Sequence, residues 1–100
     1  MNSKLKDMNV DYLFKAILSL ETLEECYNFF EDLCTVPELK ALSQRLHVAK
    51  MLEERHVYSD IVNETGASTA TISRINRCIQ YGTGGYQSVI EKISAQEKKQ

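Results

Sequence analysis

The sequence predicts an all-α fold of about six helices in one domain spanning residues 1–100. Apolar residues recur at spacings of three and four along most of the chain, which is the period of amphipathic helices. Residues that interrupt helices are scarce, because Pro37 is the single proline and all four glycines lie at or after Gly66. The hydrophobic fraction of 43% is too high for a disordered chain, and scattered charges exclude a membrane span.

Two helices are expected in the first third of the chain. The segment DYLFKAILSL has helical apolar spacing and predicts the first of them. The pattern T-x-x-E from Thr22 to Glu25 predicts the start of the second, since the threonine hydroxyl accepts from a free helical amide and the glutamate bonds back. The expected apolar positions of this second helix are Leu23, Cys26, Tyr27, Phe30 and Leu33.

A third and longest helix follows the same signal. Thr35 and Glu38 repeat the capping pattern, with Pro37 in the first turn, where a missing backbone donor costs nothing. We expect this helix to run to about Glu54 and to be followed by a turn over residues 55–58. Its expected buried stripe is Leu39, Leu42, Leu46, Ala49 and Leu52, widened by Val48.

Aromatic side chains are concentrated in the first two helices. A chain of 100 residues has a small core of its own, so this aromatic load is more than two short helices need. The sequence therefore predicts an obligate homodimer in which each chain completes the core of the other. The aromatic residues concerned are Tyr12, Phe14, Tyr27, Phe29 and Phe30.

A helix-turn-helix is predicted at about residues 58–81. A short helix closes at Gly66, the residue best suited to a left-handed cap, and Ser68 caps the next helix. Two helices joined by so tight a turn cross at a steep angle and share an apolar interior. The residues expected to fill it are Ile61, Val62, Ile72, Ile75 and Ile79.

The outer face of the second of these helices is polar and free of acidic residues. No Asp or Glu occurs from Gly66 to Ile90, although the whole chain has a net charge of -2. Short side chains in the first turn allow close approach to a major groove about 12 Å wide, and arginines reach phosphate or guanine. We expect Ser68, Thr69, Ala70 and Ser73 to face bases, Thr71, Arg74 and Arg77 to face phosphate, and Ser59 to lie near the DNA backbone.

The distribution of charge along the chain is compatible with other functions as well. Residues 1–65 carry seven basic and twelve acidic side chains, whereas residues 66–100 carry five and two. The acidic part is compatible with a protein-interaction module that keeps the fold without binding DNA. A small-molecule sensor without DNA binding is a third alternative. For the second helix of the predicted helix-turn-helix taken alone, a polar face exposed to solvent is the simplest interpretation.

The runs TGASTATISR and ELKALSQRL resemble the Trp repressor superfamily, and most closely its Trp-repressor-related YerC/YecD branch. The resemblance covers about residues 23–93. It implies an intertwined homodimer whose N-terminal and last helices interlock with the partner chain. It also implies two reading heads in successive major grooves of double-stranded DNA, so that the target would be a pseudo-palindrome.

The same resemblance points to a ligand position. In the family, tryptophan lies between two arginines, which match Arg45 and Arg74 here. Ile75 stands where the tryptophan-responsive repressor has glycine, and Cys78 replaces a serine that holds the ligand's amino group. The turn before residue 58 is also one residue shorter. Tryptophan is therefore not expected as corepressor, and we interpret Ile75 as a built-in wedge that replaces it.

Other chemistry is not predicted. His47 and His56 lack metal-binding spacing, and the three cysteines are an odd number without a paired motif, which favours reduced thiols. GTGG lacks the Lys and hydroxyl of a phosphate loop and indicates a hinge before a last helix at about Gln87 to Ser94, with the tail SAQEKKQ frayed. We expect no enzyme, no metal and no cofactor. The N-terminus lacks a secretory signal, so a cytoplasmic location without a membrane partner is expected.

Tryptophan is expected not to bind with micromolar affinity in a calorimetric titration, because the branched side chain of Ile75 occupies the space that the indole needs. A micromolar dissociation constant would refute the interpretation of Ile75 as a wedge.

Overall fold

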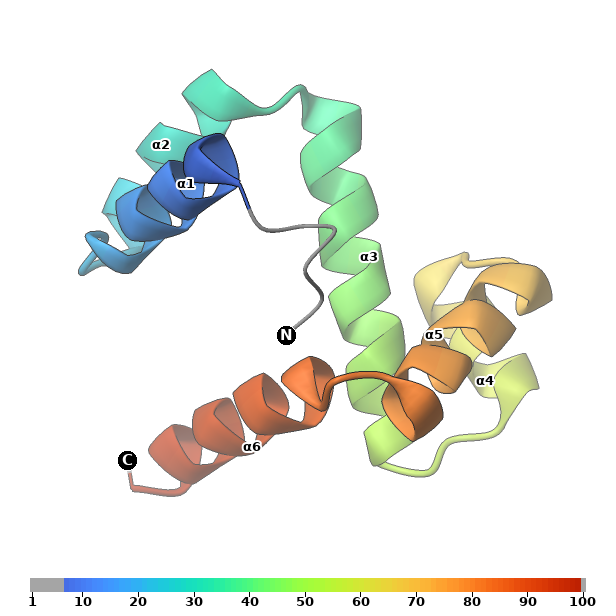
Figure 1. Cartoon of the computed structure of the whole chain (residues 1–100). Helices are drawn as coiled ribbons and strands as arrows, with labels where there is room; N and C mark the ends of the chain where they lie inside the picture. The colour runs from blue at the N-terminus through green and yellow to red at the C-terminus, as the bar shows by residue number, and fades with distance from the viewer. Residues whose placement is uncertain (1–6, 100) are drawn as a thin grey trace. The chain divides into compact units, whose positions relative to one another are not determined.

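The computed structural model describes residues 7–99, which form six helices and no strand (Figure 1). The helices are α1 (Met8–Leu18), α2 (Leu23–Leu33), α3 (Val36–Glu53), α4 (Tyr58–Thr65), α5 (Thr69–Tyr81) and α6 (Gly85–Lys98). The predicted all-α class is confirmed. The chain divides into two compact units, an N-terminal unit that ends at Leu39 and a C-terminal unit that begins at Lys40.

Side-chain caps start the first three helices. Asp7 accepts a hydrogen bond from the Val10 amide at 2.7 Å, so α1 begins before the segment that the periodicity indicated. Thr22 accepts from the Glu25 amide at 3.1 Å, as predicted. The Glu25 carboxylate bonds back to the Glu21 amide, one residue before the expected partner.

The cap of α3 is fully reciprocal. The Thr35 amide donates to Glu38 Oε1 at 2.8 Å, and the Glu38 amide donates to Thr35 Oγ1 at 3.3 Å, which confirms the predicted capping box. Hydrogen bonding of the Glu38 carboxylate to Thr35, first to its backbone amide and then to its side chain, holds the pKa of Glu38 below the ordinary value of 4.5.

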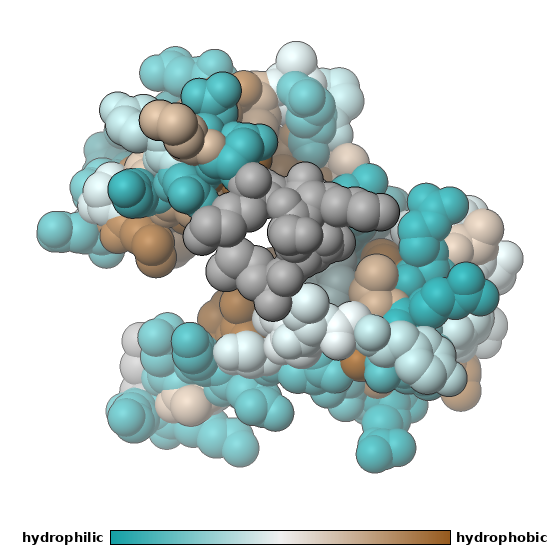
Figure 2. All heavy atoms as spheres, in the orientation of Figure 1, coloured by the Kyte–Doolittle hydropathy of each residue, from teal (hydrophilic) through white to brown (hydrophobic). Residues whose placement is uncertain are grey.

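The N-terminal unit buries little of its apolar surface. Neither α1 nor α2 contains a fully buried residue. Phe29 and Phe30 make an edge-to-face pair with ring centroids 5.5 Å apart, while Tyr12 and Tyr27 remain 76% and 70% exposed. Apolar side chains accordingly reach the surface of this unit (Figure 2).

The C-terminal unit has the core, and α3 contributes only part of its predicted buried stripe to it. Val48, Ala49 and Met51 are buried there, whereas Leu42 and Leu46 are 47% and 40% exposed. The expected stripe was therefore wrong for these two leucines, because α3 is apolar on more than one side and only one side meets α4 and α5. The buried side chains are Val48, Ala49, Met51, Ile61, Ala67, Ile72 and Ile75.

The last helix is longer than predicted. It begins at Gly85, after Gly84 in a left-handed conformation with φ of 83°, and continues to Lys98 instead of ending near Ser94. The predicted fraying of the tail is thus wrong as far as Lys98, since Ala, Gln, Glu and Lys in this segment are good helix formers. Gln100 lies outside the described residues.

Glu38→Gln should reduce the dependence of stability on acid pH. Because the folded-state pKa of Glu38 is lowered, its contribution is present above the ordinary value of 4.5 and is lost as the pH falls through the folded-state pKa. The wild type should melt at a higher temperature than Glu38→Gln at neutral pH, and the two should converge in acid. Glu53→Gln, at the other end of α3, is the control, because it removes a carboxylate of the same kind outside the capping box. Parallel curves for the wild type and Glu38→Gln would contradict the capping role.

Candidate nucleic-acid interface

Helices α4 and α5 are joined by a turn that hydrogen bonds hold. Gly66 has a φ of 73° and donates its amide to the Val62 carbonyl at 2.9 Å. The Thr65 hydroxyl donates to the Ile61 carbonyl at 2.7 Å and accepts from the Ala67 amide at 3.1 Å. A Cβ at Gly66 would meet no atom within 4 Å, so glycine is needed there for its backbone conformation and not for space.

The interior of this pair is apolar. Ile61 and Ile72 are fully buried, and Ala67 and Ile75 nearly so, as the spacing predicted. Val62 and Ile79 are partly buried and pack against the same cluster. Both helices lie beside the C-terminal part of α3 (Figure 1), so three helices share one core.

The cap of α5 uses hydroxyls that the sequence assigned to DNA. Ser68 Oγ accepts from the Thr71 amide at 3.1 Å and lies 3.1 Å from Thr71 Oγ1. Thr71 is partly buried, whereas Ser68 is exposed. Both hydroxyls therefore have a structural role, and Ser68 would contact DNA with the capacity that remains after capping.

The outward face of α5 brings most of the predicted contact residues together. Ala70, Ser73, Arg74 and Arg77 line a shallow hollow of about 220 Å³. Thr69 is exposed at the start of the helix, and Ser59 is exposed on α4. Within residues 7–99 the ion pairs are His47–Glu64 and His56–Glu54, so neither arginine is neutralised by a carboxylate in this part of the chain.

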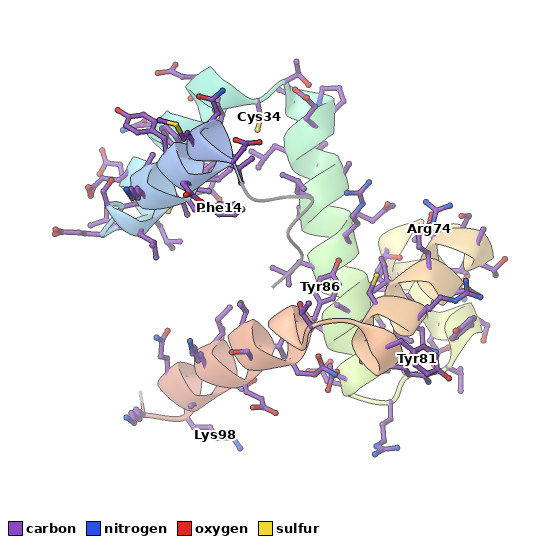
Figure 3. All side chains as sticks on the ribbon, viewed as in Figure 1. Phe14, Cys34, Arg74, Tyr81, Tyr86 and Lys98 are labelled. Carbon is purple, nitrogen blue, oxygen red and sulfur yellow. The ribbon has the colours of Figure 1, made fainter. Side chains whose placement is uncertain are left out.

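A second hollow lies behind the arginines. Its volume is about 380 Å³, and its walls come from α3, α5 and α6. Figure 3 shows Arg74 on α5 and Tyr86 at the start of α6, two of the residues that line it. The full set is Ala41, Gln44, Arg45, Thr71, Arg74, Ile75, Cys78 and Tyr86.

The four residues expected at a ligand position therefore meet in one place. Arg45, Arg74, Ile75 and Cys78 all line this hollow. Ile75 is 4% exposed, belongs to the buried core and also forms part of the wall of this hollow. A volume of about 380 Å³ is within the range of about 300 to 1,000 Å³ of small-molecule sites.

Sequence reasoning missed half of the hollow. Ala41 lies one helical turn before Arg45, and Gln44 is its neighbour, so helical spacing alone could have found them. Thr71 lies one turn before Ile75 and was assigned only to phosphate. Tyr86 comes from α6 and had no local signal, since only tertiary packing brings it to α3.

The potential metal ligands of the described part of the chain are dispersed over the fold. No group of three or more His, Cys, Asp or Glu residues within residues 7–99 is placed to hold a metal ion. Cys26 and Cys34 are partly buried and Cys78 is exposed, all as free thiols. None of the helices in this range is both long and apolar enough to cross a membrane.

The fold and the turn define a helix-turn-helix protein, and comparison with known proteins gives the family. The sequence model of the Trp repressor protein family matches residues 8–94. The uncharacterised protein YerC of Bacillus subtilis (strain 168) is 52% identical over 94 residues, which cover 94% of this chain and 90% of that protein. The chain belongs to the Trp repressor family, as the sequence resemblance implied.

Solved structures agree with this assignment. A TrpR-like protein from Eubacterium eligens ATCC 27750 superposes with a TM-score of 0.89 at 57% identity, covering 93% of this chain and 96% of that one. A structure from Staphylococcus aureus gives a TM-score of 0.87 at 52% identity, with 91% of each chain covered.

Proposed function

We propose that the protein is a sequence-specific DNA-binding transcriptional regulator, a repressor that acts as a homodimer without tryptophan as corepressor. The observation that carries the proposal is the outward face of α5, where Ala70, Ser73, Arg74 and Arg77 lie together. Short side chains lie in the first turns and two arginines follow, which suits a helix inserted in the major groove. The family supports the same class of function.

The reading head would combine two kinds of contact. Thr69, Ala70 and Ser73 are small enough for base edges to approach the helix closely. Arg74 and Arg77 supply cations that no described carboxylate neutralises, and these give salt-dependent attraction to phosphates. Ser59 on α4 would contact the DNA backbone and fix the register.

The proposed homodimer rests on unpartnered apolar surface in both units. In the N-terminal unit Tyr12, Leu18 and Leu23 are more than three-quarters exposed. In the C-terminal unit a groove of about 380 Å³ between α3 and α6 has an apolar floor that includes Leu46, Ile90 and Ile93. Exposed apolar areas of this kind mark interfaces, and a second copy supplies both surfaces at once.

Charge is compatible with this arrangement. Helix α2 carries four acidic residues and no basic residue. The rim of the groove between α3 and α6 includes Lys50 on α3 and Glu97, opposite in sign, on α6. An acidic helix of a second copy would meet the favourable charge of Lys50 along the α3 side of this rim.

A protein-interaction module without DNA binding is the second candidate. The acidic N-terminal part of the chain and the exposed apolar residues of α1 and α2 favour it. The hollow with Arg45 and Arg74 favours the third, a sensor of a small anionic molecule. Salt dependence separates the first candidate from the other two.

Replacement of both Arg74 and Arg77 by Ala should weaken binding to a duplex selected from a random pool and flatten its salt dependence. The slope of log affinity against log salt should decrease by about 0.9 for each phosphate that is no longer neutralised. Fluorescence anisotropy over a salt series measures this slope.

The matched control replaces Lys98 and Lys99 by Ala, which removes the same charge at the far end of the C-terminal unit, where Lys98 lies remote from Arg74 (Figure 3). An equal decrease of the slope in the control would show nonspecific attraction. No retention of the wild type on any duplex at low salt would favour the interaction module.

The wild type should sediment at twice the chain mass of 11.4 kDa at micromolar concentration. Tyr27→Glu should shift it towards the monomer, because it places a charge in the proposed interface. Tyr81→Glu is the control, since Tyr81 is 81% exposed against 70% for Tyr27 but lies on α5 and does not line the groove between α3 and α6. A monomeric wild type, or equal effects of the two substitutions, would contradict the dimer.

A further inference from the structure

One side-chain hydrogen bond links the turn of the helix-turn-helix to α3. The Gln44 amide donates to the Thr65 carbonyl at 3.1 Å, between residues 21 apart in the sequence. Among residues 7–99 it is the only side-chain hydrogen bond between α3 and the α4–α5 pair. One helical turn further along α3, His47 lies 3.9 Å from Glu64, but both of these side chains are well exposed to water.

The bond lies at the point where the backbone most needs a partner. Thr65 is the last residue of α4, and carbonyls at the end of a helix have no donor within it. Gln44 and Thr65 form a bond that is partly buried, so water does not fully replace the amide. Removal of the donor would leave the Thr65 carbonyl short of a partner.

Packing does not hold this turn on its outer side. No atom lies within 4 Å of where a Cβ of Gly66 would be, so the turn has open space on its outer side. On its inner side Gln44 also lines the hollow of about 380 Å³, which leaves room for the side chain to turn away. The hydrogen bond therefore adds to the burial of Ala67 and of the flanking Ile61 and Ile72 in holding the turn on α3.

The turn leads directly into the residues that face outward from α5. Ser68 caps this helix, and Thr69 and Ala70 form its first turn. A displacement of the Thr65 carbonyl would move these residues as a group, because the Thr65 hydroxyl donates to the Ile61 carbonyl and accepts from the Ala67 amide and so holds the turn together.

We infer that Gln44 is a positioning residue for DNA binding, which sets the direction of the first turn of α5 by holding the Thr65 carbonyl. This inference rests on the proposed function. Gln44 does not touch DNA. It acts on base recognition more than on phosphate attraction, because base contacts require a defined orientation and nonspecific binding does not.

Gln44→Glu tests the hydrogen bond, since it keeps the shape and replaces the donor by an acceptor. Gln44→Met removes the donor without adding charge. Both substitutions should lower the hydrogen-exchange protection of the Ala67 amide about tenfold, because each removes the hydrogen bond that holds the turn to α3. Gln96→Glu adds the same charge on α6 and should leave this protection unchanged.

The Val48 amide, in the core of the same unit, distinguishes positioning from general weakening. Its protection should be the same in the wild type and in both Gln44 variants. Unchanged protection at Ala67, or an equal decrease at Val48, would overturn the inference.

The second measurement is the ratio of affinities for a selected duplex and for random duplexes at one salt concentration. Both Gln44 variants should lower this ratio about tenfold, with an unchanged salt slope for random DNA. An unchanged ratio despite lower protection at Ala67 would overturn the positioning role. If the wild type binds no DNA, the proposed function fails, and the exchange experiment alone then shows whether Gln44 holds the turn.

Discussion

The burial of Ile61, Ile72 and Ile75 against one face of α3 is the interaction on which the helix-turn-helix depends. Helix α4 has eight residues and α5 has thirteen, lengths at which isolated helices are marginal in water. Their stability and their crossing come from the core that they share with Val48 and Met51. Because the outward face of α5 contributes nothing to that core, its side chains are free to serve contact with another molecule.

The N-terminal unit shows the opposite balance. Capping by Asp7, Thr22 and Thr35 defines where its helices begin, but caps contribute only about 1 kcal/mol each. Without a buried residue in α1 or α2, these helices have little else within their own unit to stabilise them. In the proposed dimer the association free energy would also be folding free energy for this unit, so that folding and assembly form one equilibrium.

Features set by local sequence were predictable, and features set by packing between distant segments were not. The capping box at Thr35, the glycine turn at Gly66 and the cap at Ser68 each follow from a few neighbouring residues, and the structure has all three. The choice of face on α3 was wrong for Leu42 and Leu46, because periodicity finds an apolar stripe but does not say which neighbour covers it.

The candidate site follows the same rule. Arg45, Arg74, Ile75 and Cys78 were placed together through a family resemblance, and the hollow contains them. Tyr86 and the bond from Gln44 to Thr65 needed the structure, since each joins segments far apart in the chain. Their contribution depends on tertiary distances that composition and spacing do not encode.

Three consecutive positions before α5 are restricted for three different reasons. Gly66 is held by its positive φ, Ala67 by burial and Ser68 by its capping bond. Substitution at these positions would disturb the turn and the start of α5 before it changed the residues that face outward from α5. If the proposed function holds, a change of target sequence would come mainly from substitutions from Thr69 onward, while the turn stays the same.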